Sequence, residues 1–104
     1  MNCVIITNVN NGEKANEMAQ ELVREKLAAC VNIIPGVTSV YRWDNNIVND
    51  SEWLLLIKTR TTMSGEIETY FHHHHPYDVP EIAVLHVDHL NEAYEQWIKD
   101  SLKD

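Results

Sequence analysis

Apolar residues along this chain follow two different periods, and these periods predict its secondary structure. A spacing of three to four residues predicts helices, while short apolar runs and strict alternation predict strands. From residue 13, apolar side chains recur at helical spacing and glutamates occupy the opposite face. In chain order the predicted elements are a strand at 3–7, a helix at 13–27, a strand at 28–43, a strand at 47–60, a helix at 61–75, a strand at 82–87 and a helix that Asn91 caps.

The stretch from Ala28 to Trp43 is too long for an ordinary strand of about 5–6 residues. Proline cannot donate to a strand ladder and glycine tolerates a bulge, so we expect Pro35-Gly36 to bend one long strand. The turn residues at 44–46 then predict that 47–60 returns as its hairpin partner. The part beyond the bend would overhang a small sheet as an apolar ribbon. We therefore expect an oligomer.

The second strand of this hairpin is apolar on both faces. Trp53, Leu55 and Ile57 alternate with Leu54 and Leu56. Such a strand is typical of one that is buried on both sides. The predicted helices cover one face of a one-layer sheet, so we expect the other face to meet another subunit.

The element order predicts an α+β fold, a ferredoxin-like βαββαβ sandwich with an additional C-terminal helix and a long bent β-hairpin. We expect a single domain over residues 1–104. In this topology the first strand pairs with the third and fourth strands, and the second strand lies outside the third. Cys3 and Cys30 are then separated by a strand, which argues against a disulfide between them.

Composition narrows the possible partners. Sixteen acidic and eight basic residues give a net charge of -8, which disfavours nucleic acid and anionic membrane and favours cations near the surface. The longest apolar run, Trp53 to Ile57, is far shorter than a membrane span. No basic and apolar leader is present at the N-terminus, so we expect a cytoplasmic protein. Two cysteines cannot form a disulfide framework.

Two motifs resemble the CutA divalent-cation tolerance protein family. The first is Ala28–Val37 followed by Ser39, Tyr41, Arg42 and Trp43, and the second is His75–Tyr77 with Val79–Ile82. The resemblance implies a stable homotrimer of ferredoxin-like subunits, similar in assembly to PII signalling proteins, and the motifs establish no catalytic reaction. It also implies a role in tolerance of divalent cations, notably copper. The chain departs from the family pattern in having four consecutive histidines, 72–75, before Pro-Tyr.

Three residues are candidate metal ligands. Cys30 offers a soft thiolate, although free cysteine is more often a small buried apolar residue. His75 offers an imidazole, or it packs at a helix end. Three roles stay open for Glu81: it binds the metal, it accepts hydrogen bonds from backbone amides, or it pairs with Lys58 or Arg42. Together, Cys30, His75 and Glu81 would form a mixed sulfur, nitrogen and oxygen site for copper(II) or another divalent cation.

The histidine run offers a second candidate site. His72 and His75 are three residues apart and share a face of the predicted helix, so a transition metal could bridge them. Adventitious binding is the simpler reading of such a pair. His86 and His89 are too loosely spaced to predict a site.

Tyr41, Trp43 and Trp53 are better explained as interface packing than as a ligand box, because aromatic residues are enriched at interfaces. The predicted trimer-interface residues are Tyr41, Trp43, Trp53 and Trp97. The chain lacks a glycine-rich phosphate loop, a G-x-S-x-G motif and a Cys-x-x-Cys pair, so we do not expect an enzyme.

The leading hypothesis is a homotrimer that binds divalent metal, copper first. The alternative is a PII-like trimeric scaffold or signalling protein that binds a small molecule or partner protein at inter-subunit clefts. That alternative is a fold-level analogy. An enzyme at a cleft formed by His75, Tyr77 and Glu81 is the weakest hypothesis.

Overall fold

The computed structural model describes residues 1–104 and confirms the predicted order of elements. The four strands form one antiparallel sheet in the order β2-β3-β1-β4, which confirms the predicted strand neighbours. The elements are β1 (Asn2–Val9), α1 (Gly12–Arg24), β2 (Cys30–Trp43), β3 (Asn46–Arg60), a 3-10 turn η1 (Thr61–Met63), α2 (Ser64–His74), β4 (Ala83–His86) and α3 (Glu92–Ser101).

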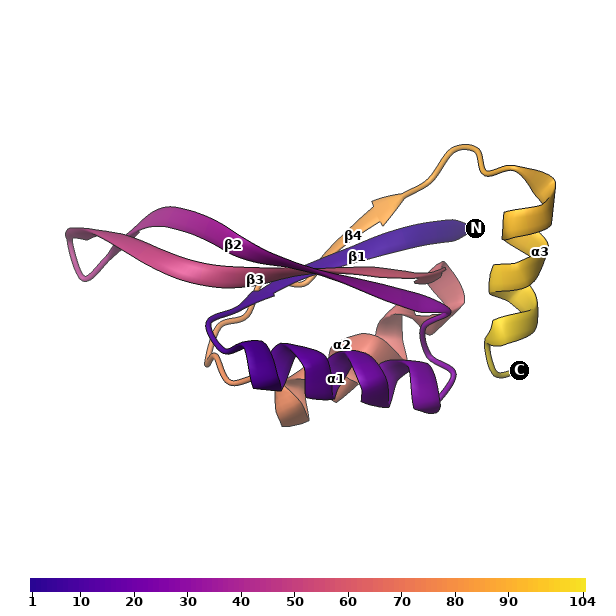
Figure 1. Ribbon diagram of the computed structural model, residues 1–104, viewed down its shortest axis with the longest axis horizontal. Helices are drawn as coiled ribbons and strands as arrows, with labels where there is room; N and C mark the ends of the chain where they lie inside the picture. The colour runs from indigo at the N-terminus through magenta and orange to yellow at the C-terminus, as the bar shows by residue number, and fades with distance from the viewer.

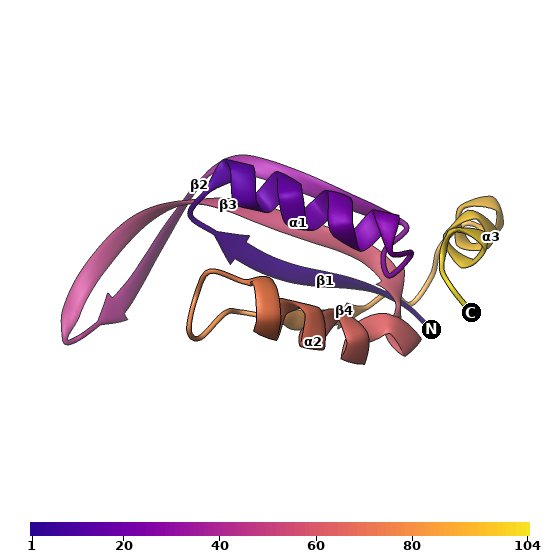
Figure 2. The same ribbon diagram turned by 90° about the horizontal axis from the view of Figure 1, so that it is seen from below.

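Helices α1 and α2 lie side by side on one face of the sheet (Figures 1 and 2). Asn11 caps α1, because its side chain accepts a hydrogen bond from the Lys14 amide. The core lies between these two helices and the sheet. Its fully buried large side chains include Ile5, Met18, Leu22, Leu55, Ile57, Ile67 and Phe71.

The β2–β3 hairpin projects well beyond the helices, which gives the subunit an elongated shape of 45 × 26 × 22 Å (Figure 1). The ladder between its strands is interrupted between Ile34 and Val37, which confirms the predicted bend at Pro35-Gly36. Gly36 has a φ of +74°, a conformation that favours glycine. Asp44 and Asn45 at the tip also have positive φ, as their turn role predicts.

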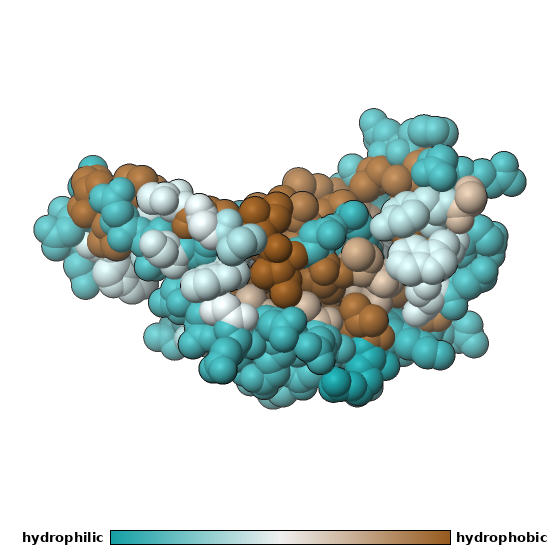
Figure 3. Space-filling model, viewed as in Figure 1, coloured by the Kyte–Doolittle hydropathy of each residue, from teal (hydrophilic) through white to brown (hydrophobic).

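The second face of the sheet, the open face, is apolar but is not covered by α1 or α2. Strand alternation and register place these apolar side chains on it: Val4, Ile6, Ile34, Leu54, Leu56 and Leu85. Leu54 and Leu56 are half-buried, whereas Leu55 and Ile57 are fully buried on the helix face. The prediction of an apolar strand on both sides is therefore confirmed. Figure 3 shows apolar atoms in the middle of the sheet region and near the hairpin tip, above the polar outer surface of the helices.

Helix α2 differs from its predicted form at both ends. It begins at Ser64 after the 3-10 turn rather than at residue 61, with Met63 at the N-cap position, and the Ser64 hydroxyl donates to the Thr61 carbonyl. It ends at His74 because Pro76 disfavours helical backbone at the residue before it. His74, the last helical residue, is exposed and stacks on Tyr70 with 4.4 Å between ring centroids.

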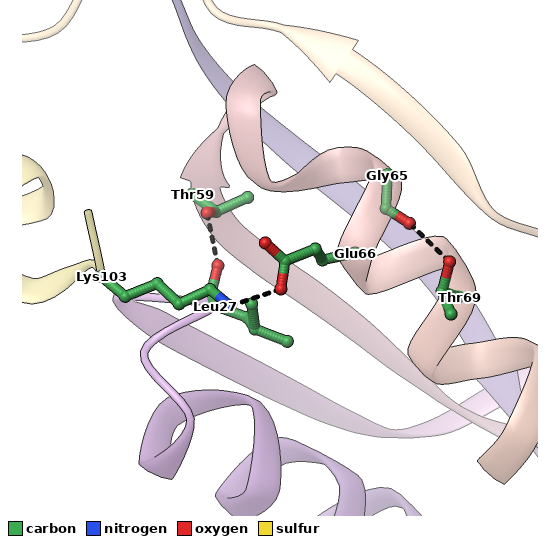
Figure 4. Close-up of polar contacts among 6 residues, drawn as sticks. All are labelled: Leu27, Thr59, Gly65, Glu66, Thr69 and Lys103. Carbon is green, nitrogen blue, oxygen red and sulfur yellow. Dashed lines mark hydrogen bonds and ion pairs between the residues drawn. The ribbon is translucent and has the colours of Figure 1, made fainter.

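The C-terminal segment is tied to the helix layer. Lys103 donates its backbone amide to the Lys26 carbonyl and its ammonium group to Glu66 of α2. Figure 4 shows this ion pair beside the hydrogen bond from Thr59 to the Leu27 carbonyl. In α3, Ile98 is the only buried residue, and Asn91 precedes the helix but makes no side-chain capping bond, unlike the predicted cap. No helix has both the length and the apolar character that a membrane crossing requires.

Candidate functional site

His75 lies just past the end of α2, with both ring nitrogens hydrogen-bonded inside the subunit. Its Nδ1 accepts from the Tyr77 backbone amide at 3.1 Å. The proton is therefore assigned to Nε2, which lies 2.9 Å from the Thr7 hydroxyl. Burial lowers the pKa of His75, and smaller opposing effects of the Asn8 backbone and the Glu52 charge raise it. A metal ion could bind this ring only by displacing one of the two contacts.

Tyr77 and Glu52 form the shortest hydrogen bond in the same region. The Tyr77 hydroxyl donates to a Glu52 carboxylate oxygen at 2.5 Å, and Glu52 is only 6% exposed. Burial and the bond to Glu52 raise the pKa of Tyr77. The contact holds the segment after α2 against the base of the hairpin. We did not predict Glu52 as a site residue, although a carboxylate next to an apolar stretch of strand was a usable signal.

Glu81 is held by a neighbouring strand. One of its carboxylate oxygens accepts from the Asn8 side-chain amide at 2.8 Å. Neither Lys58 nor Arg42 pairs with it, so those two predicted alternatives are not observed. Glu81 is exposed, and its second carboxylate oxygen makes no hydrogen bond in the structure.

Cys30 opens β2 on the open face of the sheet, directly opposite Lys58. It is half-buried, and its thiol is free. Cys3 is buried on the opposite face of β1, where burial raises the pKa of its thiol. Strand β3 separates the two cysteines, which confirms that they form no disulfide.

The three candidate ligands do not come together within one subunit. His75 contacts Thr7 on the helix face, whereas Cys30 lies on the open face of an outer strand. Glu81 contacts Asn8, which is four residues along β1 from the position level with Cys30. Strand spacings place Asn8 roughly 10 Å across and about 13 Å along the sheet from Cys30. No three His, Cys, Asp or Glu side chains of the subunit are placed to hold one metal ion.

The histidine run also differs from its prediction. His75 lies beyond the last helical residue with extended backbone, so the expected helix face shared by His72 and His75 does not form. His72 is exposed on α2. His73 bonds the Thr69 carbonyl, and the ring of His74 stacks on a tyrosine. The four side chains therefore have four different surroundings.

Three of the predicted interface aromatics are exposed in the subunit. Tyr41 is 40%, Trp97 46% and Trp43 60% exposed, and Tyr41 donates a hydrogen bond to Asp50. The ring of Trp53 is half-buried against α1, where Gly12 leaves space for it. Their contribution to an interface between subunits stays a prediction.

Comparison with known proteins identifies the family. The sequence model of the family described as CutA1 divalent ion tolerance protein matches residues 3–101. The "Divalent-cation tolerance protein CutA" of Thermus thermophilus is 43% identical over 98 residues, which cover 94% of this chain and 95% of that protein. The "Protein CutA, chloroplastic" of Arabidopsis thaliana is 41% identical over 97% of this chain. This chain spans only 56% of the length of that plant relative.

Solved structures agree with the fold. The divalent cation tolerance protein of Thermus thermophilus superposes with a TM-score of 0.95 at 42% identity, covering 99% of this chain and 100% of that one. CutA1 from Oryza sativa gives a TM-score of 0.96 at 39% identity, covering 99% and 94%. The names of the family and its members describe tolerance of cations and no reaction, in agreement with the prediction of a non-enzymatic protein. The chain belongs to the CutA1 divalent ion tolerance protein family.

Proposed function

We propose that this protein is a cytoplasmic homotrimer that binds divalent cations, copper first, and contributes to their tolerance. Membership in the CutA1 divalent ion tolerance family is the observation that carries this proposal. The net charge of -8 and the free thiol of Cys30 agree with it, because cations are attracted to an acidic protein and copper prefers soft ligands.

The open face supports the trimer. Ile34 and Leu85 on this face are 41% and 49% exposed, although they are apolar. Val40, Trp43 and Ile47 near the hairpin tip are each at least 60% exposed. Contiguous apolar surface of this kind marks a protein–protein contact. The β2–β3 hairpin projects away from the rest of its own subunit, so its apolar tip is placed to contact a neighbouring subunit (Figure 1).

The proposed metal site needs more than one subunit. Cys30 presents its thiol on the open face, and Glu81 keeps one carboxylate oxygen without a hydrogen bond. We propose that these groups, with His75, meet across the boundary between neighbouring subunits. His75 would contribute only after releasing Thr7 or the Tyr77 amide.

Copper titration followed by native mass spectrometry and calorimetry tests this proposal. The double variant Cys30→Ser and His75→Asn is expected to weaken copper binding by about tenfold or more while the trimer is retained. The matched control replaces His72, His73 and His74 with asparagine, which removes exposed imidazoles only. Unchanged affinity in the double variant, or loss of affinity in the control alone, would reject the assigned site.

The second candidate is a PII-like scaffold that binds a small molecule or partner protein at inter-subunit clefts. Both ring nitrogens of His75 are hydrogen-bonded inside the subunit, so neither is free to bind a metal ion. This favours the scaffold role over metal binding. A thermal-shift screen of nucleotides and metabolites, run beside divalent metals, separates the two functions. A metabolite that raises the melting temperature, with no response to metals, would favour the scaffold.

A further inference from the structure

The chain contains one Asn-Gly pair, Asn11-Gly12, at the start of α1. Asparagine before glycine loses its side-chain ammonia most readily, because glycine has no Cβ to hinder its backbone nitrogen and leaves the backbone free to rotate. The other two glycines follow Pro35 and Ser64. Asn11 is exposed, so water reaches it. Its chemistry therefore singles out Asn11 as the asparagine most prone to deamidation.

The folded backbone of Asn11 opposes this reaction. Deamidation begins when the Gly12 nitrogen attacks the side-chain carbonyl carbon of Asn11, which requires the Asn11 Cβ to eclipse that nitrogen. Asn11 has a φ of -144° and a ψ of 118°, an extended conformation in which Hα rather than Cβ lies closest to the following nitrogen. The two reacting atoms can meet only after a large rotation about ψ.

Two hydrogen bonds of Asn11 resist that rotation. Its Oδ1 accepts from the Lys14 amide at 2.9 Å, and its backbone carbonyl accepts from the Ala15 amide at 3.0 Å. Rotation about ψ swings the carbonyl away from Ala15, and the attack turns the side chain away from Lys14. Both bonds belong to the first turn of α1, so this turn must open before Asn11 can react.

Packing explains why the reactive pair is present. A Cβ atom at position 12 would lie 3.0 Å from two carbons of the Trp53 ring, which packs against the core. A larger residue after Asn11 would slow the attack, but the fold disfavours it. Asn11 in turn serves as the helix cap. Both members of the pair therefore have structural roles.

We propose that Asn11 is a site of spontaneous deamidation whose rate is set by opening of the first turn of α1. In the open turn, the Gly12 nitrogen gives up its proton and forms a bond to the side-chain carbonyl carbon of Asn11. The bond to the side-chain nitrogen breaks, and that nitrogen leaves with the proton as ammonia. Water then opens the cyclic imide. Attack of water at the side-chain carbonyl gives aspartate, and attack at the backbone carbonyl gives isoaspartate.

The two products differ in their effect on α1. Aspartate keeps a side-chain oxygen that can accept from the Lys14 amide, and its negative charge is favourable at a helix N-terminus. Isoaspartate carries the chain through its side-chain carbon and adds a methylene group to the backbone, which displaces the acceptor. The first product is expected to preserve the start of α1, and the second to loosen it.

The test measures ammonia loss at Asn11 by mass spectrometry of peptides from the full-length protein aged at neutral pH, beside the same protein unfolded in guanidinium chloride. The folded protein is expected to deamidate Asn11 at least about tenfold more slowly, since only open turns react. Equal rates in the two states would overturn the proposal, and so would another asparagine reacting first in the unfolded chain. No metal takes part, so the result is independent of the proposed copper site.

Two glycine substitutions separate opening of the first turn from unfolding of the whole helix. Glu13 and Gln20 are both exposed on α1, and Gln20 lies about two turns further along. Glu13→Gly is expected to speed deamidation of Asn11 in the folded protein by about threefold and to leave the rate in the unfolded chain unchanged. Gln20→Gly is the matched control, with little effect expected in either state. Equal acceleration by both variants would reject the role of the first turn.

Discussion

The hydroxyl of Tyr77 lies 2.5 Å from the carboxylate of Glu52, and this contact joins the segment after α2 to the base of the β2–β3 hairpin. Glu52 is almost fully buried, so this hydrogen bond compensates for the contacts with water that its carboxylate has lost. The hairpin projects beyond the helices (Figure 1), and the contact anchors its base to the segment that follows α2. This anchor leads to the first prediction.

Replacing Tyr77 with phenylalanine is expected to lower the free energy of unfolding by about 2 kcal/mol, because it leaves a buried carboxylate without its donor. Denaturant unfolding measures the loss. Tyr41→Phe is the matched control, since the Tyr41 hydroxyl makes a longer bond of 3.3 Å to Asp50 at an exposed position. Equal losses of unfolding free energy in the two variants would show that the bond between Tyr77 and Glu52 stabilises the fold no more than an exposed hydrogen bond does.

Alanine at Gly12 is expected to destabilise the protein by roughly 1–3 kcal/mol, because overpacking displaces a held side chain. A Cβ atom there would lie 3.0 Å from two carbons of the Trp53 ring, which packs against the core. Gly65→Ala is the control, because a Cβ at that helical position meets open space. It is expected to raise stability by up to about 1 kcal/mol. Thermal unfolding of both variants tests the pair, and a stabilised Gly12→Ala would contradict the packing.

Trp53 and Trp43 are expected to differ in what they stabilise. Trp53→Ala should lower subunit stability by about 2 kcal/mol, somewhat less than for a fully buried tryptophan, because its ring is half-buried. Trp43→Ala, at an exposed tip, should leave subunit unfolding nearly unchanged and weaken only the proposed trimer. Chemical unfolding and native mass spectrometry distinguish the two effects. A loss below about half a kilocalorie for Trp53→Ala would mean that its packing was misread.

Stability is expected to fall as the pH drops below the ordinary histidine value. Burial lowers the pKa of His75 below 6.5 in the folded state, so between these two values the unfolded chain binds more protons than the folded one. The contribution of neutral His75 is therefore complete above pH 6.5 and is lost as the pH falls toward the folded pKa. Unfolding in chelator across this range measures it.

The advantage of the unchanged protein over His75→Asn is expected to shrink as the pH falls. His72→Asn serves as the control because that ring is exposed, and its pH profile is expected to match that of the unchanged protein. An advantage that stays constant from neutral to acidic pH would contradict the assigned state of His75.

The sequence predicted the fold well and the candidate site poorly. Period and turn chemistry act over a few residues, so the bend at Pro35-Gly36, the turn at Asp44-Asn45 and the strand order could all be predicted. The end of α2 was harder. The preference imposed by Pro76 on the preceding residue placed His75 outside the helix and removed its pairing with His72.

By itself, the sequence determined the ferredoxin-like order of elements and the family, because both depend on patterns that repeat locally along the chain. The tertiary structure decided which polar groups meet. Thr7 reaches His75, and Glu52 reaches Tyr77, only because strand register and the path after α2 bring distant residues together. The same register holds Cys30 away from His75 on the opposite face of the sheet. Long-range contacts of this kind depend on the register of all the strands in the sheet, which no local pattern encodes.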